Sequence, residues 1–139
     1  MTKKRFEDNL AQNIFSAIEK GFSFVSTLIS GKPKCASELA STIERKLSEI
    51  NSLDDKSKII EYDKLTSYTL TKMGVRGETF SQKIKNYKKY IRESEYRDIW
   101  RAHIVRNKIS HEIDYNPPLN ELKDAQIKFY KFLRRVKSE

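Results

Sequence analysis

The 139-residue chain has little of what small proteins use to stabilise loop-rich or metal-bound folds. Cys35 is its single cysteine, so neither an internal disulfide nor a cysteine-based zinc site can form. Four glycines and three prolines are few, which is typical of helices joined by short loops. The longest apolar stretch, "FSFVSTLIS", is too short and too rich in serine to span a bilayer. The first residues, "MTKKRFEDNL", lead into no apolar core of a secretory signal, so we expect a cytoplasmic protein that does not use a membrane.

Acidic residues are also scarce relative to basic ones, and the imbalance is local. Residues 80–139 hold 15 lysines and arginines against 8 acidic residues, a balance of +7, whereas residues 1–79 hold 13 against 11. A cationic surface attracts polyanions, of which nucleic acid is the most common. The alternative is a lysine-rich surface that serves solubility alone.

Apolar residues recur at helical spacing along the whole chain. The pattern predicts helices over residues 3–30, 36–51, 54–73, 79–93 and 95–113, and a last helix that starts near Pro118. Asp54 or Asp55 should lie near the positive end of the third of these helices, and Ser94 should cap the fifth. No alternating strand pattern of useful length occurs. We therefore expect an all-α bundle of about five to six helices that forms a single domain over residues 1–139.

Histidine is rare as well, with two in the chain, and one of them follows an arginine and an asparagine closely. In "RNKISH", Asn107 and His111 are four residues apart and so share a helix face, while Arg106 lies to the side of that face. An arginine presents a fork of donors that suits phosphate, and a neutral histidine accepts a proton near neutral pH. Together they could cleave RNA, with a base for the ribose 2′-hydroxyl and a cation for the phosphorane. Arg106 could instead be a surface residue paired with Glu112 or Asp114.

The stretch "RNKISHEIDY", near the end of the penultimate helix of a small basic bundle, resembles the HEPN superfamily (higher eukaryotes and prokaryotes nucleotide-binding domain). In that family's motif an arginine is followed by a polar residue, and four to six residues separate the arginine from a histidine. Arg106, Asn107 and His111 match this motif, with the four residues "NKIS" between the arginine and the histidine. The resemblance implies a metal-independent endoribonuclease whose site forms between two protomers. It also implies a toxin with a cognate antitoxin, or a component of phage defence. Ile113 stands where one branch of the family, paired with nucleotidyltransferase antitoxins, has a tyrosine, which argues against that branch.

On this resemblance His111 would be the general base or acid, Arg106 would hold the scissile phosphate, and Asn107 would orient His111 or bind the phosphate. Tyr96, Ile99, Trp100 and the last helix are candidates for the homodimer contact. Two alternatives stay open. One is an inactive HEPN-like domain that binds RNA, a nucleotide or a protein, and the other is a helical adaptor with a coincidental motif.

Further residues are candidates for binding RNA. The stretch "KIKNYKKYIR" interleaves lysines with aromatic rings, and base stacking between cations suits single-stranded RNA. We expect RNA contacts from Lys88, Lys89, Tyr90, Arg101 and Lys108. A metal ion is not expected, because His103 and His111 are about 12 Å apart along a helix and cannot share one. No cofactor is expected either. His103 is predicted to lie at the edge of the core or to face a partner.

Overall fold

The computed structural model describes residues 31–139; the helix predicted over residues 3–30 lies outside them. Within residues 31–139 the regular structure consists of helices and includes no strand, which confirms the predicted all-α bundle. Residues 34–139 form one compact unit. Its elements are α2 (Ser37–Ile50), α3 (Asp55–Lys72), α4 (Phe80–Tyr87), the 3₁₀ turn η1 (Lys88–Tyr90), α5 (Glu93–His111) and α6 (Leu119–Ser138).

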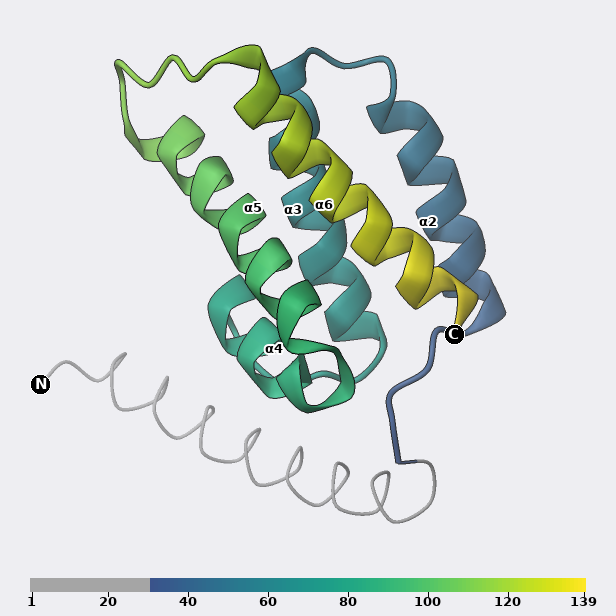
Figure 1. Cartoon of the computed structure of the whole chain (residues 1–139). Helices are drawn as coiled ribbons and strands as arrows, with labels where there is room; N and C mark the ends of the chain where they lie inside the picture. Colours follow the sequence, from purple (N-terminus) through teal and green to yellow (C-terminus); the bar gives the residue numbers. More distant parts are fainter. Residues whose placement is uncertain (1–30) are drawn as a thin grey trace, which may run out of the picture. The chain divides into compact units, whose positions relative to one another are not determined.

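Four long helices make an up-and-down bundle, with the short α4 across one end (Figure 1). Helices α2 and α5 run in one direction, and α3 and α6 run in the other. Helix α3 contacts all three of the other long helices and also α4. A side chain on α3 can therefore reach both α4 and α5.

Local signals explain where most of these helices begin. Asp54 lies at the positive end of α3, where the sequence predicted Asp54 or Asp55, and its carboxylate caps the helix by accepting hydrogen bonds from the amide and the hydroxyl of Ser57. These bonds lower the pKa of Asp54. Thr79 and Gln82 form a reciprocal capping box at the start of α4.

Three predicted boundaries need correction. Helix α4 ends at Tyr87, not near residue 93, because the chain tightens into η1 and then becomes extended at Ile91. Helix α5 begins at Glu93 with Arg92 as its N-cap, so Ser94 lies inside the helix rather than at its cap. Pro118 has extended backbone angles and is the N-cap of α6 rather than part of its first turn.

The core lies between the four long helices and is formed mainly by aliphatic and aromatic side chains. Its fully buried members include Ile43, Ile59, Leu70, Ile84, Tyr87, Ile99, Phe129, Leu133 and Val136. Tyr96 and Ile99, which the sequence suggested for a dimer contact, are 9% and 1% exposed. They pack inside the chain, which excludes them as surface contacts; Trp100 is half-buried and keeps an outward edge.

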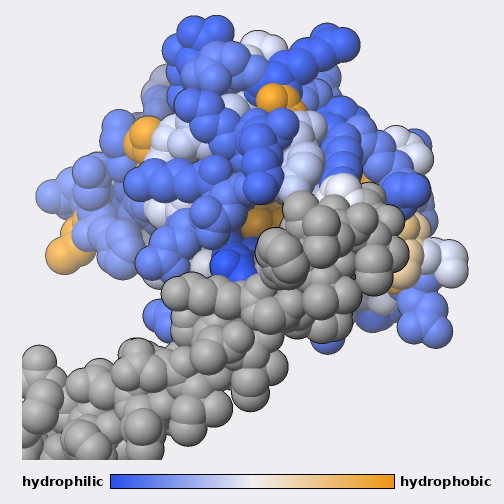
Figure 2. All heavy atoms as spheres, turned by 90° about the horizontal axis from the view of Figure 1, so that it is seen from below, coloured by the Kyte–Doolittle hydropathy of each residue, from blue (hydrophilic) through white to orange (hydrophobic). Residues whose placement is uncertain are grey.

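The surface is polar for the most part. The face in Figure 2 is largely hydrophilic where the described residues are visible, and its hydrophobic side chains are scattered. Within residues 31–139, none of the helices combines the length and apolar character that crossing a membrane requires.

Candidate functional site

Helix α5 carries all three residues of the "RNKISH" motif, but they do not meet. His111 is the last residue of the helix and is exposed, and within residues 31–139 it has no hydrogen bond or ion pair. Arg106 precedes it by five residues, which turns the two side chains about 140° apart around the helix axis. The Arg106 side chain points inward and is 28% exposed. One chain therefore presents its arginine and its terminal histidine in different directions.

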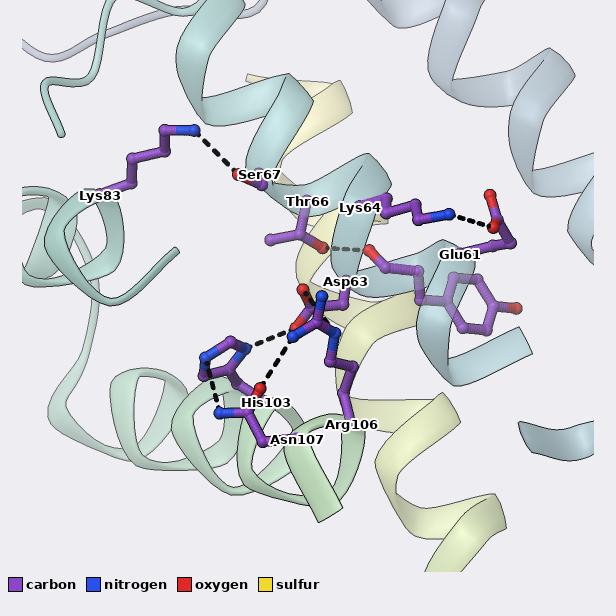
Figure 3. Close-up of polar contacts among 10 residues, drawn as sticks. Glu61, Asp63, Lys64, Thr66, Ser67, Lys83, His103, Arg106 and Asn107 are labelled. Atoms are coloured by element: carbon purple, nitrogen blue, oxygen red, sulfur yellow. Dashed lines mark hydrogen bonds and ion pairs between the residues drawn. The ribbon is translucent and has the colours of Figure 1, made fainter. Parts of the chain in front are cut away.

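Arg106 and Asn107 instead join a buried polar ring with His103 and Asp63 (Figure 3). The His103 Nδ1 atom lies 2.6 Å from Asp63 Oδ2, and Arg106 Nε lies 3.6 Å from Asp63 Oδ1. Arg106 Nη1 donates to Asn107 Oδ1 at 2.9 Å, and Asn107 Nδ2 lies 3.3 Å from His103 Nε2. These four side chains, called the polar ring below, close a circuit between α3 and α5.

The circuit fixes the direction of each hydrogen bond. An ionised Asp63 only accepts, so His103 Nδ1 carries a proton and donates it. Because Asn107 Oδ1 accepts from Arg106, the amide Nδ2 of Asn107 faces His103 Nε2 as a donor. His103 Nε2 must then accept, which requires the neutral imidazole with its proton on Nδ1. The geometry thus defines one tautomer for His103.

Burial makes the ring energetically important. The Asp63 side chain is 5% exposed and that of His103 is 8% exposed. A carboxylate so buried is tolerated only where it is paired and hydrogen-bonded, which is what His103 and Arg106 provide. The contact between Arg106 Nε and Asp63 is longer than a hydrogen bond and acts as an electrostatic attraction.

Aromatic rings hold the histidine in place. The imidazole of His103 stacks on Phe80 of α4, with centroids 4.0 Å apart and planes 6° from parallel. It also stacks on Trp100, one turn earlier on α5, at 5.8 Å and 23°. Three helices therefore fix the orientation of this ring: α3 through Asp63, α4 through Phe80 and α5 through its own backbone.

A surface hollow of about 480 Å³ opens beside the polar ring. Its walls come from α3, from the start of α4 and from α5. The lining residues include Asp63, Ser67, Thr71, Thr79, Ser81, Lys64, Lys83, His103, Arg106 and Asn107. Three of these side chains are cations and one is a carboxylate, so the hollow is electropositive.

The sequence predicted Arg106 and Asn107 as site residues but not their partners. Arg106 pairs with Asp63 rather than with Glu112 or Asp114. Both side-chain contacts of Asn107 go to His103 and Arg106, and none goes to His111. Sequence reasoning missed Asp63 and gave His103 a place at the core edge, whereas His103 is 6% exposed.

A sequence signal for Asp63 does exist. Asp63 follows Ile59 by four residues and precedes Leu70 by seven, so helical spacing places a carboxylate on the apolar face of α3. A charged residue in such a position needs a buried partner. In the structure His103 and Arg106, three residues apart on α5, supply it.

The predicted RNA-binding residues fall into two groups. Arg101 and Lys108 are exposed on α5 and are seven residues apart, hence on one face of the helix. Lys88, Lys89 and Tyr90 belong to η1, before α5 begins. The Lys88 ammonium pairs with Glu93 at 3.6 Å, and those of Lys88 and Lys89 lie over tyrosine rings. Tyr90 is half-buried against Tyr87, so its ring is less available for base stacking than the sequence suggested.

The loop after His111 is held on both sides. The Tyr115 hydroxyl donates to Glu121 Oε1 at 2.7 Å, and Lys56 Nζ donates to the Tyr115 carbonyl at 3.1 Å. Burial, together with the Glu121 carboxylate, raises the pKa of Tyr115 to about 12. Between His111 and Tyr115, Ile113 is fully exposed. The end of α5 is thus tied to α3 and α6 while His111 itself stays accessible.

Comparison with known proteins found no relative of the chain. No family model, no curated protein and no solved structure matches the chain. Within residues 31–139, no three residues among histidine, cysteine, aspartate and glutamate cluster in a way that could hold a metal ion. The polar ring, the hollow and the exposed face of α5 are therefore the features of the chain that bear on its function.

Proposed function

We propose that the chain is a HEPN-type endoribonuclease that cleaves RNA without a metal ion, at a site shared between two protomers. The observation that carries the proposal is the arrangement of α5. The polar ring holds the Arg106 guanidinium beside an electropositive hollow, and His111 stands exposed at the end of the same helix. A held cation and an accessible imidazole are the two groups that attack by a ribose 2′-hydroxyl requires.

In this proposal a second protomer compensates for the angle between Arg106 and His111 around α5. Two α5 helices related by a two-fold axis can bring His111 of one protomer toward Arg106 of the other, which a single helix cannot do. Ile104, which is 49% exposed, and the half-buried Trp100 lie on the same side of α5 as His111 and about 120–160° around the helix from Arg106, so they can pack only beside the histidine half of a shared site. Trp100 thus stays a candidate for the dimer contact, and Ile104 takes the place of Tyr96 and Ile99.

In this proposed mechanism each of the three motif residues has one role. His111 takes the proton of the 2′-hydroxyl or gives one to the leaving oxygen, and Arg106 stabilises the charge on the phosphorane. Asn107 keeps the guanidinium in place through its 2.9 Å bond to Arg106 Nη1. The products are a 2′,3′-cyclic phosphate and a 5′-hydroxyl, because the attacking group belongs to the RNA itself. A toxin with a cognate antitoxin, or a phage-defence nuclease, would use such an activity.

The same face of α5 that would pair is cationic. Arg97, Arg101 and Lys108 are exposed along it. Like charges oppose association of two such faces, and bound RNA would neutralise them. Affinity for RNA should consequently fall steeply as salt concentration rises.

The test is cleavage of labelled RNA by the full chain in excess EDTA, with end-group analysis of the products. His111→Ala and Arg106→Ala should each abolish cleavage, and Ser110→Ala, at the same exposed helix end, should retain it. A shared site makes a sharper prediction for a mixture of the two inactive variants. Random pairing gives half of the dimers one of each chain, and each mixed dimer has one intact site of two, so about a quarter of wild-type activity should return.

Three outcomes would contradict this function: cleavage that needs added magnesium, full activity in either single variant, or cleavage by a protein that stays monomeric. If RNA binds but is never cleaved, the second candidate, a non-catalytic RNA- or nucleotide-binding domain, replaces the first. One observation favours that candidate, because the polar groups of Arg106 and Asn107 already bond each other in the absence of RNA.

A further inference from the structure

The hollow beside the polar ring contains a lysine whose charge has no counter-ion. Lys83 extends from α4 toward α3, where its Nζ atom donates to Ser67 Oγ at 2.9 Å (Figure 3). Its side chain is half-buried, and among residues 31–139 it forms no ion pair. The other two cations of the hollow differ in this respect, because Lys64 pairs with Glu61 and Arg106 with Asp63.

A half-buried lysine whose ammonium bonds only to a neutral hydroxyl is unusual. Lysines are seldom buried without a partner, since partial removal from water costs free energy that a hydroxyl offsets poorly. The lining holds the cations Lys64, Lys83 and Arg106 and the carboxylate of Asp63; with Glu61, the partner of Lys64, counted as well, three cations face two carboxylates and the balance is +1. Asp63 is already occupied by His103 and Arg106, so it leaves the charge of Lys83 unbalanced.

The remaining groups around Lys83 can donate hydrogen bonds to an anion. Ser67 accepts from Lys83, and Thr79 accepts from the Gln82 amide, so each keeps its own hydroxyl proton for another acceptor. Ser81 adds a third hydroxyl at the start of α4. Of the first amides of that helix, that of Gln82 is bonded to Thr79, whereas those of Phe80 and Ser81 have no acceptor within the helix and carry a partial positive charge. These groups come from α3 and α4 and surround one concave space.

We propose that this hollow is a binding site for a phosphate group, with Lys83 as its central contact and Ser67, Thr79 and Ser81 as hydrogen-bond donors. Phosphate oxygens only accept, which matches a lining of donors with excess positive charge. A metal cation would be repelled by the same lining. The phosphate belongs either to a free nucleotide or to an RNA strand that continues past Arg106, and the site rests on the proposed function only in the second case.

The experiment follows binding without cleavage, using the full chain with His111→Ala as the background. Titration with inorganic phosphate, uridine 5′-monophosphate, uridine and a short RNA would be monitored by amide chemical shifts in NMR. Phosphate and the nucleotide should shift the amides of Ser67 and Ser81, and uridine should not. If the mononucleotide saturates the chemical-shift change, the ligand is a free nucleotide. If the RNA saturates it and the mononucleotide does not, the ligand is a phosphate of an RNA strand.

Two lysines of α4 provide a matched pair. Lys83→Met keeps the aliphatic stem and removes the charge, and it should weaken phosphate binding about tenfold, as expected for one charge-assisted contact. Lys85→Met, on the exposed face of the same helix, should change it less than about twofold. Without phosphate, Lys83→Met should melt no lower than the unsubstituted chain, because it removes an uncompensated charge.

The two proposals fail separately. If phosphate at millimolar concentration shifts neither Ser67 nor Ser81, or if both methionine variants bind it equally, the phosphate site is refuted even where RNA cleavage is intact. If phosphate binds as described and RNA is never cleaved, the site stands and the ribonuclease proposal is lost.

Discussion

Replacement of His103 by phenylalanine tests whether the polar ring depends on its histidine. Phenylalanine keeps a flat ring against Phe80 and Trp100, so most of the stacking survives. It removes the donor that lies 2.6 Å from Asp63 and leaves that carboxylate with only the Arg106 contact at 3.6 Å. Removal of one partner from a buried pair costs about 3–5 kcal/mol. Because Arg106 remains, we expect the free energy of unfolding to fall by about 3 kcal/mol, near the lower bound of that range.

A second substitution should reverse much of this loss. His103→Phe combined with Asp63→Leu removes the carboxylate that has lost its partner. Apolar replacement of both members of a buried pair often leaves the free energy of unfolding nearly unchanged. The double variant should therefore be more stable than His103→Phe alone by about 2 kcal/mol, a strongly non-additive result. Arg106, at 28% exposure, can turn its guanidinium toward water once Asp63 is gone.

Urea unfolding followed by far-ultraviolet circular dichroism measures these differences, provided that the slope with denaturant is unchanged. Tyr96→Phe is the control, since Tyr96 is a buried aromatic residue on the same helix whose hydroxyl has no hydrogen bond within residues 31–139; we expect a change below about 0.5 kcal/mol. The reasoning about the ring would be refuted if His103→Phe matched the wild type, or if Asp63→Leu added its own cost to that of His103→Phe.

Two further predictions concern the segments that flank the site. Gly77→Ala should lower the free energy of unfolding in urea by about 2–3 kcal/mol, since φ is +131° there and a Cβ would lie 2.8 Å from the backbone nitrogen of Lys83. The control is Gly74→Ala, at φ +86° with open space around it, which should lower the free energy of unfolding clearly less. Equal losses in the two variants would show that the close approach to α4 does not matter. Above pH 10 the unfolded chain loses the Tyr115 proton while the folded chain keeps it to about pH 12, so stability should decline as the pH rises through this interval. Tyr115→Phe should remove that part of the decline, and an unchanged pH profile in this variant would count against the bond to Glu121.

Apolar spacing was enough to predict that each described α-helix exists, because burial of one face stabilises a helix whichever element covers that face. The spacing of Leu39, Ile43, Leu47 and Ile50, for example, predicted residues 36–51 and the structure has Ser37–Ile50. The capping role of Asp54 was equally local, since a side chain and an amide three residues apart suffice. Boundaries that depend on competing local conformations, such as the end of α4 at Tyr87, were less accurate.

The candidate site was likewise predicted in part from the sequence and decided in part by the tertiary structure. Sequence alone placed Arg106, Asn107 and His111 on one helix and marked the basic character of that half of the chain. Only the tertiary structure turned Arg106 and Asn107 toward Asp63 and His103, because Asp63 lies 40 residues away from His103 and meets it through the packing of α3 on α5. The uncompensated charge of Lys83 is likewise a property of three packed helices, since a lysine in a sequence shows neither how deeply it is buried nor which carboxylates fail to reach it.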